Sequence, residues 1–175
     1  MAHVEGHLED ALGPFQSAVT LLRTMPGLGE TAARVLVAEI GVDMTRFPSA
    51  GHLVSWAGLC PRLNESAGKR HSTRVRHGAP WLKTTLVQAA WAATRAKNSY
   101  LQAQFHRIKG RRGPKKAIIA VAASMLTAAY FMLRDGVEYR DLGGRYFEDR
   151  NKQQVTDRLL RRLRDLGVSV EVKAA

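Results

Sequence analysis

The chain has 175 residues and a mass of 19.3 kDa, a length that allows one compact domain or two small ones. Apolar residues make up 45% of the sequence and charged residues 24%, which excludes wholesale disorder. The 27 Lys and Arg residues outnumber the 15 Asp and Glu residues, and the formal net charge of +12 indicates an anionic partner, either nucleic acid or an anionic membrane surface.

The first third of the sequence predicts three helices. Apolar residues recur there at helical spacing, and the expected helices cover residues 15–22, 30–40 and 49–56. Met25-Pro26-Gly27 is expected to end the first helix, and Gly41 is a natural C-cap for the second. Ser49 is a suitable N-cap for the third. The sequence therefore begins as an all-helical arrangement.

A long loop and two further helices are expected next. Residues 61–80 are rich in Gly, Ser and Arg and show little periodicity, so they predict a long ordered loop of a functional kind. One helix is expected over 81–95, a basic turn over 109–114, and a second helix over 115–133. The uncharged stretch 117–133 is short for a membrane span and rich in Ala, which favours a buried core helix.

The tail predicts an amphipathic helix with arginines on its polar side. Its apolar side is formed by Val155, Leu159, Leu163 and Leu166. Val168, Val170 and Val172 alternate with polar residues and predict one short strand. The fold class is therefore mainly α: a helical hairpin, a basic loop and a helical bundle, with at most one short C-terminal strand.

Residues 15–41 resemble a helix-hairpin-helix DNA-binding motif. The connecting sequence Pro26-Gly27-Leu28-Gly29 is followed by Thr31, and Gly27, Gly29 and Thr31 are the candidate DNA-contacting residues. Glycines let backbone N–H groups approach a phosphate, and the second helix directs its positive N-terminus toward it. The alternative is a plain helix–helix turn, in which Gly is also common. Both interpretations remain open from spacing alone.

The positive charge is concentrated in the middle of the chain. Between Glu65 and Asp135 there is no acidic side chain, while fourteen Lys and Arg residues fall there. A surface that is merely solvated normally mixes both signs, so this central basic segment predicts a nucleic-acid-facing surface. We interpret Trp81 and Trp91 as core residues and not as base-stacking platforms. The candidate DNA contacts are Gly68, Lys69, Arg70, Arg74, Arg76, Lys83, Lys109, Arg111, Arg112, Lys115 and Lys116.

Ser66 is the candidate catalytic residue. It lies in a small, flexible context followed by Lys and Arg, where a serine is able to attack phosphorus while the bases stabilise the charge that develops. The alternative is that Ser66 is a turn former, the usual role of serine in such a loop. Composition alone does not decide between them.

A succession of motifs resembles the C-terminal domain of the IS110 transposase family of insertion sequences. The motifs are PGLGETAARVLVAEIG, FPSAGHLVSWAGLCP, NESAGKRHSTR and PWLK, and the likeness extends over residues 15–147. The resemblance implies an N-terminal RuvC-like domain with metal-binding acids, a serine that forms a phosphoserine link to DNA, and a structured guide RNA. By the same resemblance the protein acts in DNA transposition and recombination in bacteria.

The family's serine falls on Ser66, and Gly68, Lys69, Arg74 and Arg76 belong to its surrounding motif. Ser72 is the fallback nucleophile. Three positions depart from the family pattern, since Gly, Lys and Asn are common where this sequence has Thr73, His77 and Ala79. These departures alter loop flexibility and polar contacts, and they make the activity of the chain an open question.

The sequence supplies no counterpart of the RuvC-like domain, because residues 1–14 are too few and are interpreted as a linker remnant. The expected division is completed by the transposase domain at 15–147 and an amphipathic helix and tail at 148–175. The serine loop is assigned to residues 56–83 and further helices to 81–134. No metal ligands or cofactors are expected in this chain, since the divalent metal belongs to the missing domain.

The expected partners are DNA, a guide RNA and further copies of the full-length protein, with no membrane. The single cysteine and the absence of a basic, apolar leader predict a cytoplasmic protein. The expectation is part of a transposase, with the isolated chain inactive. The alternatives are a nucleic-acid-binding module without chemistry and, least favoured, a membrane-surface protein.

Overall fold

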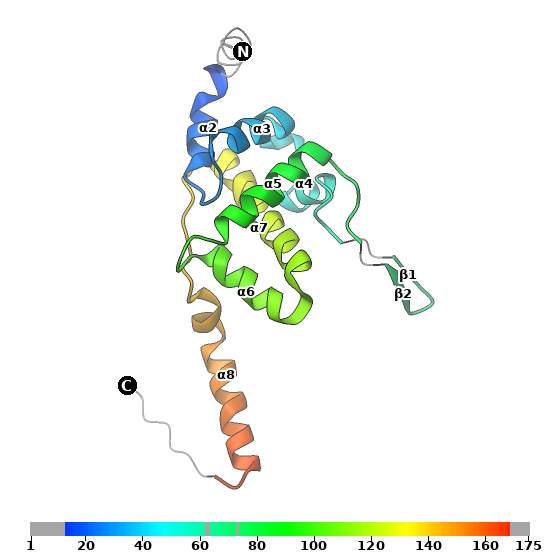
Figure 1. Ribbon diagram of the computed structural model, residues 1–175, viewed down its shortest axis with the longest axis vertical. Coiled ribbons are helices and arrows are strands. Elements are labelled where there is room, and N and C mark those ends of the chain that lie inside the picture. Colours follow the sequence, from blue (N-terminus) through cyan, green and yellow to red (C-terminus); the bar gives the residue numbers. More distant parts are fainter. Residues whose placement is uncertain (1–12, 62–63, 73, 169–175) are drawn as a thin grey trace.

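The computed structural model describes residues 13–61, 64–72 and 74–168, which form a body of packed helices from which a strand hairpin and a final helix project (Figure 1). The helices are α2 (Gln16–Arg23), α3 (Glu30–Ile40), α4 (Ala50–Trp56), α5 (Pro80–Ala93), α6 (Tyr100–Arg112), α7 (Pro114–Asp135) and α8 (Tyr146–Asp165). Short 3₁₀ turns lie at Gly13–Phe15 and Met44–Arg46. Strands β1 (Asn64–Ser66) and β2 (Lys69–Ser72) pair antiparallel. The mainly α fold class predicted from the sequence is confirmed.

Helix α7 is the centre of the body, and α2, α4, α5 and α6 pack around it. It is long and apolar enough to cross a membrane by length and composition, yet half of its most apolar window is buried inside the protein. Its buried side chains include Val121, Met125 and Leu126. The Tyr130 hydroxyl donates to the Phe47 carbonyl at 3.2 Å, which ties α7 to the segment before α4. The prediction of a core helix at 115–133 is confirmed.

Most of the expected helices are present with bounds shifted by one or two residues. Those predicted over 15–22, 30–40, 49–56 and 81–95 correspond to α2, α3, α4 and α5. The capping residues also act as expected: the Ser49 hydroxyl accepts from the His52 N–H, and Gly41 ends α3 with a positive φ of 73°. Local propensity and capping therefore determine these elements.

Three expectations for the rest of the chain need correction. The prediction of a basic turn over 109–114 is wrong, because α6 continues to Arg112. Gly113, at φ 81°, is the single residue between α6 and Pro114, where α7 begins. The long loop over 61–80 contains the β1–β2 hairpin. The tail helix begins at Tyr146, earlier than its apolar pattern indicated. Of the predicted strand at 168–172, all but Val168 lies outside the described residues.

Helix α8 is attached to the body at its first turn and then projects away from it (Figure 1). The Phe147 ring stacks on Tyr100 with ring centroids 5.0 Å apart, and the Tyr146 ring meets Tyr100 edge-on at 5.3 Å. The Asp141 carboxylate accepts from the Tyr100 N–H at 2.9 Å and fixes the segment that leads into α8. An aromatic contact at one end therefore determines the direction of a twenty-residue helix.

Candidate nucleic-acid interface and serine arm

The turn between α2 and α3 rests on α5. Gly27 has φ 85°, and a Cβ built there would lie 2.3 Å from the Ala89 carbonyl oxygen and 2.6 Å from the Ala93 nitrogen. Met25 and Leu28 on either side are buried, at 1% and 4% exposure. Gly27 is thus required for a close approach within the protein, between the turn and a helix of its own body. Its role in contacting DNA stays a prediction.

Gly29 and Thr31 lie at the accessible end of α3. Gly29 is the exposed N-cap of α3, has ordinary backbone angles and has open space where a Cβ would stand. Thr31 is exposed. The Glu30 carboxylate beside them is paired with Arg34 at 2.6 Å and Arg23 at 3.6 Å. These pairs neutralise the one acid that would repel a phosphate at this helix end.

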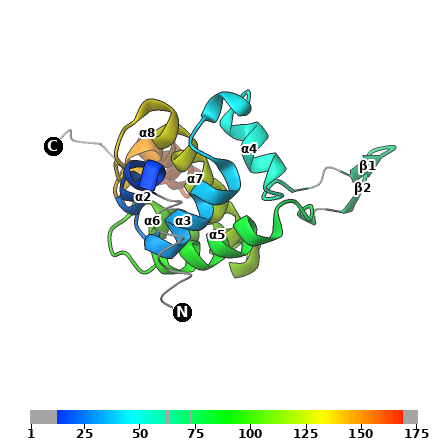
Figure 2. The ribbon, with the colours of Figure 1, turned by 90° about the horizontal axis from the view of Figure 1, so that it is seen from above.

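Ser66 lies at the tip of the strand hairpin. In the β1–β2 register Ser66 faces Lys69, and the two connecting residues, Ala67 and Gly68, have φ values of 51° and 74°. Two positive φ values in a two-residue connection are typical of a type I′ turn, which matches the twist of the strands. Ser66, Ala67, Gly68 and Lys69 are all exposed. The hairpin projects from the helical body in both views, and we call residues 61–75 the serine arm (Figures 1 and 2).

The base of the serine arm is held by two glycines. A Cβ on Gly78 would lie 2.5 Å from the Ala57 carbonyl and the Gly58 nitrogen, and a Cβ on Gly58 would lie 2.8 Å from the Arg76 carbonyl oxygen. Both glycines have positive φ, 72° at Gly58 and 56° at Gly78. The two chain segments therefore meet backbone to backbone where the arm leaves the body. We call this contact the glycine clasp.

Lys83 adds a polar tie to the same place. Its ammonium group donates to the Arg76 carbonyl at 2.9 Å and so joins α5 to the segment returning from the arm. Farther out, an isolated bridge pairs Pro61 with Val75. The predicted DNA contact Lys83 thus has a structural partner. Sequence reasoning missed Gly58 and Gly78, although glycines flanking a long loop were a usable signal.

Of the positions that depart from the family pattern, His77 and Ala79 lie at this base. Ala79 is the N-cap of α5 with extended backbone angles, φ −79° and ψ 104°, and it provides no side-chain hydrogen bond to the helix. An Asn at an N-cap accepts from the helix N–H groups, so its replacement by Ala removes a cap. His77 is exposed beside it, while Thr73 lies outside the described residues.

The second basic group surrounds the junction of α6 and α7, which lies on the same side of the body as the serine arm in the view of Figure 1. Its members are exposed and come from the last turn of α6 and the first turn of α7: Lys109, Arg111, Arg112, Lys115 and Lys116. Cations at a helix N-terminus oppose the helix dipole, so Lys115 and Lys116 reduce the stability of α7. We call these five residues the basic junction.

The structure places the predicted contacts on three separate elements. Gly27, Gly29 and Thr31 belong to the helical hairpin, the five cations to the basic junction, and the remaining candidates to the serine arm and its base. In the backbone register of the hairpin, Arg70 of β2 lies opposite Glu65 of β1. Arg74 and Arg76 are exposed. The interpretation of the tryptophans as core is wrong, because Trp81 is 76% exposed near the arm base and Trp91 is 43% exposed.

The described residues contain no group of three or more His, Cys, Asp or Glu side chains able to hold a metal ion. In that same part of the chain, no general base is hydrogen-bonded to Ser66, which is exposed at the end of β1.

Comparison with known proteins supports one family. The model of the transposase family IS116/IS110/IS902 matches residues 19–106. A 43.6 kDa protein of insertion element IS110 from Streptomyces coelicolor is 35% identical over 68% of this chain and 29% of its own length. A pilin gene-inverting protein of Moraxella bovis is 33% identical over 66% of the chain and 36% of its own length. A putative transposase of Sinorhizobium fredii is 31% identical over 70% of this chain and 32% of its own length. The chain thus spans about a third of these relatives.

Proposed function

Because the chain belongs to the IS116/IS110/IS902 transposase family, we propose that it is the DNA-contacting, nucleophile-bearing part of a DNA recombinase. The observation that supports this proposal is the position of Ser66, exposed at the tip of an arm that projects from a basic body. A nucleophile held away from the core reaches a phosphodiester in duplex DNA without entry of the duplex into a pocket. The names of the relatives, a transposase and a pilin gene-inverting protein, fit the same chemistry.

In the proposed step the Ser66 Oγ gives up its proton, forms a bond to phosphorus and displaces a deoxyribose oxygen. That oxygen takes up a proton and leaves as a hydroxyl group, and the DNA end stays joined to the protein as a phosphoserine ester. Lys69, opposite Ser66 in the hairpin, would stabilise the charge on the phosphoryl oxygens, while Arg74 and Arg76, toward the base of the arm, would contact the DNA backbone away from the reacting phosphate. The glycine clasp would fix the direction in which Ser66 is presented.

The family resemblance adds divalent metal ions bound by a RuvC-like domain. The described residues do not fit a metal site, and no step is assigned to one. The resemblance also adds a structured guide RNA and homo-oligomerisation. We propose that the basic junction and the accessible end of α3 contact the DNA backbone, and that guide RNA competes for or shares this basic surface.

A DNA-binding module without chemistry is the second candidate function. It is favoured by the lack of a hydrogen-bonded base at Ser66 within the described part of the chain. In that case the arm and the basic junction hold DNA while another protein cuts it. Both candidates predict affinity that falls steeply with salt through counterion release.

Replacing Ser66 by Ala separates the two functions. We expect S66A to lose the covalent protein–DNA product while its affinity for DNA stays within about twofold, because the hydroxyl is exposed and its removal leaves the fold intact. Binding is measured by fluorescence anisotropy with the chain alone. Covalent product is measured on denaturing gels, with the metal-binding part of a family transposase added.

The matched control is S72A, which removes the other serine of the hairpin and should leave the covalent product unchanged. A covalent product that persists in S66A and disappears in S72A would assign the nucleophile to Ser72. No covalent product from the wild-type chain, with salt-sensitive DNA binding retained, would establish the binding module as the function.

A further inference from the structure

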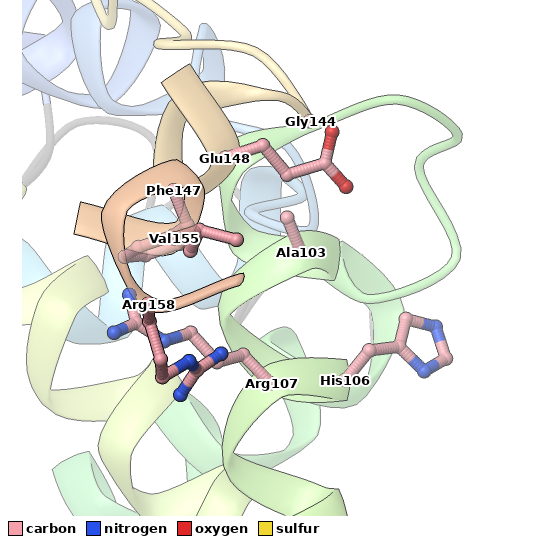
Figure 3. Close-up of a pocket in the computed structure, with 8 residues that line it drawn as sticks. All are labelled: Ala103, His106, Arg107, Gly144, Phe147, Glu148, Val155 and Arg158. Carbon is pink, nitrogen blue, oxygen red and sulfur yellow. The ribbon is translucent and has the colours of Figure 1, made fainter. Parts of the chain in front are cut away.

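A groove of about 880 Å³ opens between α6 and the first half of α8 (Figure 3). Ala103, Phe147 and Val155 form its apolar part, while His106, Arg107 and Arg158 bring polar groups to it. None of these residues belongs to the helical hairpin, the serine arm or the basic junction. The groove also lies mostly beyond residues 19–106, the part of the chain that the family model matches.

The charge in the groove is unbalanced. Arg107 comes from α6 and Arg158 from α8, and both side chains line the groove (Figure 3). Across residues 13–61, 64–72 and 74–168, no carboxylate lies within 4.0 Å of either guanidinium. The Glu148 carboxylate is at the opposite end of the groove. Two like charges in proximity repel, and an anion between them removes that cost.

Contacts within the protein hold Arg107 in position. The Arg107 guanidinium lies over the Phe147 ring, 4.8 Å from its centroid, and the Phe147 ring stacks on Tyr100. Phe147 also belongs to the first turn of α8, so the same ring directs the helix that carries Arg158. A ligand would therefore find one guanidinium already positioned, which lowers the entropy lost on binding.

We propose that this groove binds the phosphodiester backbone of DNA, with Arg107 and Arg158 gripping phosphate. A guanidinium group matches a phosphate with two parallel hydrogen bonds. The Phe147 ring is covered by Arg107 and Tyr100, so it leaves no free platform for a base and the contact is independent of sequence. The exposed Arg161, Arg162 and Arg164 continue the positive charge along α8, which favours an extended polyanion over a single phosphate ion.

The identity of the polyanion as DNA rests on the proposed function. The test measures the affinity of the full chain for a labelled DNA duplex of about 20 base pairs at several salt concentrations. We expect the double variant R107Q/R158Q to bind about tenfold more weakly at low salt, and the slope of log Kd against log salt to fall by about one to two. The R158K variant keeps the charge and should keep the wild-type slope.

The matched control is R95Q/R140Q, which removes the same charge from two exposed arginines that do not line this groove. The inference is overturned if the groove variant and this control bind alike. Arg158 is exposed, so the single variant R158Q gives a second measurement of the groove with little risk to the fold. DNA would be overturned as the occupant if the chain bound a duplex RNA of equal length more tightly and if R107Q/R158Q lost more affinity for that RNA than for DNA.

The outcomes also separate this inference from the proposed function. If the wild-type chain binds DNA in a salt-dependent way and the groove variant does so equally well, only the groove assignment fails. If the wild-type chain does not bind DNA at all, both fail. The S66A assay does not test the groove, because Ser66 belongs to β1 of the serine arm and does not line the groove.

Discussion

The helical hairpin and the serine arm are both candidate DNA-contacting elements, and they are attached to the protein in opposite ways. The helical hairpin is part of the core: Val19, Leu22 and Leu36 are fully buried, and its turn rests on α5. Among the described residues, the serine arm is tied to the body at its base, where the glycine clasp and the Lys83 hydrogen bond lie. The helical hairpin is therefore stabilised by the core of the fold, whereas the orientation of the serine arm depends on a small contact at its base.

The difference predicts how substitutions in the two elements will behave. A substitution in the helical hairpin should lower the stability of the fold more than it changes the affinity for DNA, since packing there is dense. A change in the serine arm should affect chemistry while the helical body stays folded, because a two-stranded hairpin without a core face adds little to global stability. The predictions below test this contrast at single residues.

The largest expected effect on stability is that of Gly27→Ala. The new Cβ would meet backbone atoms of α5 at 2.3 to 2.9 Å, and the residue would have to keep φ 85°. We expect a loss of about 2–4 kcal/mol in the free energy of unfolding. The matched control is Gly29→Ala in the same turn, which has open space and ordinary angles and should change stability by less than about 1 kcal/mol.

Urea unfolding followed by circular dichroism measures both variants. Equal stability of the two would contradict the packing role of Gly27. If Gly29→Ala instead lowers DNA affinity while Gly27→Ala folds poorly, the hairpin combines a structural glycine with a DNA-contacting one. That result would resolve the choice between a DNA-binding motif and a plain turn.

Gly78→Ala tests the glycine clasp. The added methyl group would stand 2.5 Å from the Ala57 carbonyl, so the returning segment has to move and the arm changes direction. We expect the covalent DNA product to fall at least tenfold, while stability falls by about 1–3 kcal/mol. Gly143→Ala is the control, because Gly143 also has a positive φ and no neighbour within 4 Å, and it lies outside the serine arm.

The two variants are compared in the covalent assay and by thermal unfolding. Unchanged product from Gly78→Ala would show that the arm finds its position on DNA without the clasp. A loss of product from Gly143→Ala of the same size would assign the effect to backbone strain and not to the clasp.

A smaller and stabilising effect is expected where the arm joins the body. Ala79→Asn introduces a side chain able to accept from the free N–H groups at the start of α5. We expect a gain of about 0.5–2 kcal/mol in the free energy of unfolding. Ala79→Leu, which cannot cap the helix, should show no such gain, and an equal gain from both variants would contradict the capping explanation. The measurement is the midpoint of urea unfolding.

The helical body was largely predictable from the sequence, because apolar spacing and caps such as Ser49 and Gly41 act locally. Helix α6 was missed, although Ser99 caps it and Leu101, Phe105 and Ile108 have helical spacing. The many polar residues of α6 obscured this apolar spacing, and the last turn of the helix was predicted as a basic turn.

The serine arm was not predictable as a hairpin. Its strands have no apolar face, and Ala67-Gly68 is a poor match to the Asn-Gly signal of a type I′ turn. Ser66 was found as a candidate through family resemblance. The glycine clasp depends on two segments, around residues 58 and 78, that meet only in three dimensions. Long-range backbone contacts of this kind leave no periodic signal in a single sequence.

The smallest expected effect is a pH dependence confined to the helical body, at Asp43 before α4. Hydrogen bonds from the Thr45 hydroxyl at 2.6 Å and the Thr45 N–H at 2.9 Å hold the pKa of the Asp43 carboxyl below its usual value. Since the folded pKa is the lower one, the stabilisation is complete above the usual value near 3.9 and is lost as pH falls through the folded pKa.

Asp43→Asn keeps a hydrogen-bond acceptor and removes the titration, so the variant isolates this effect. We expect the wild-type protein to unfold at a temperature higher by at most about 2 °C at neutral pH, with the difference disappearing below about pH 4. A difference that stays constant with pH would contradict the assignment. The serine arm beyond Glu65 contains no acidic side chain, so direct carboxylate titration there cannot produce the same signature. A pH-dependent change in the helical body that leaves the arm's DNA chemistry unaltered would support their energetic independence.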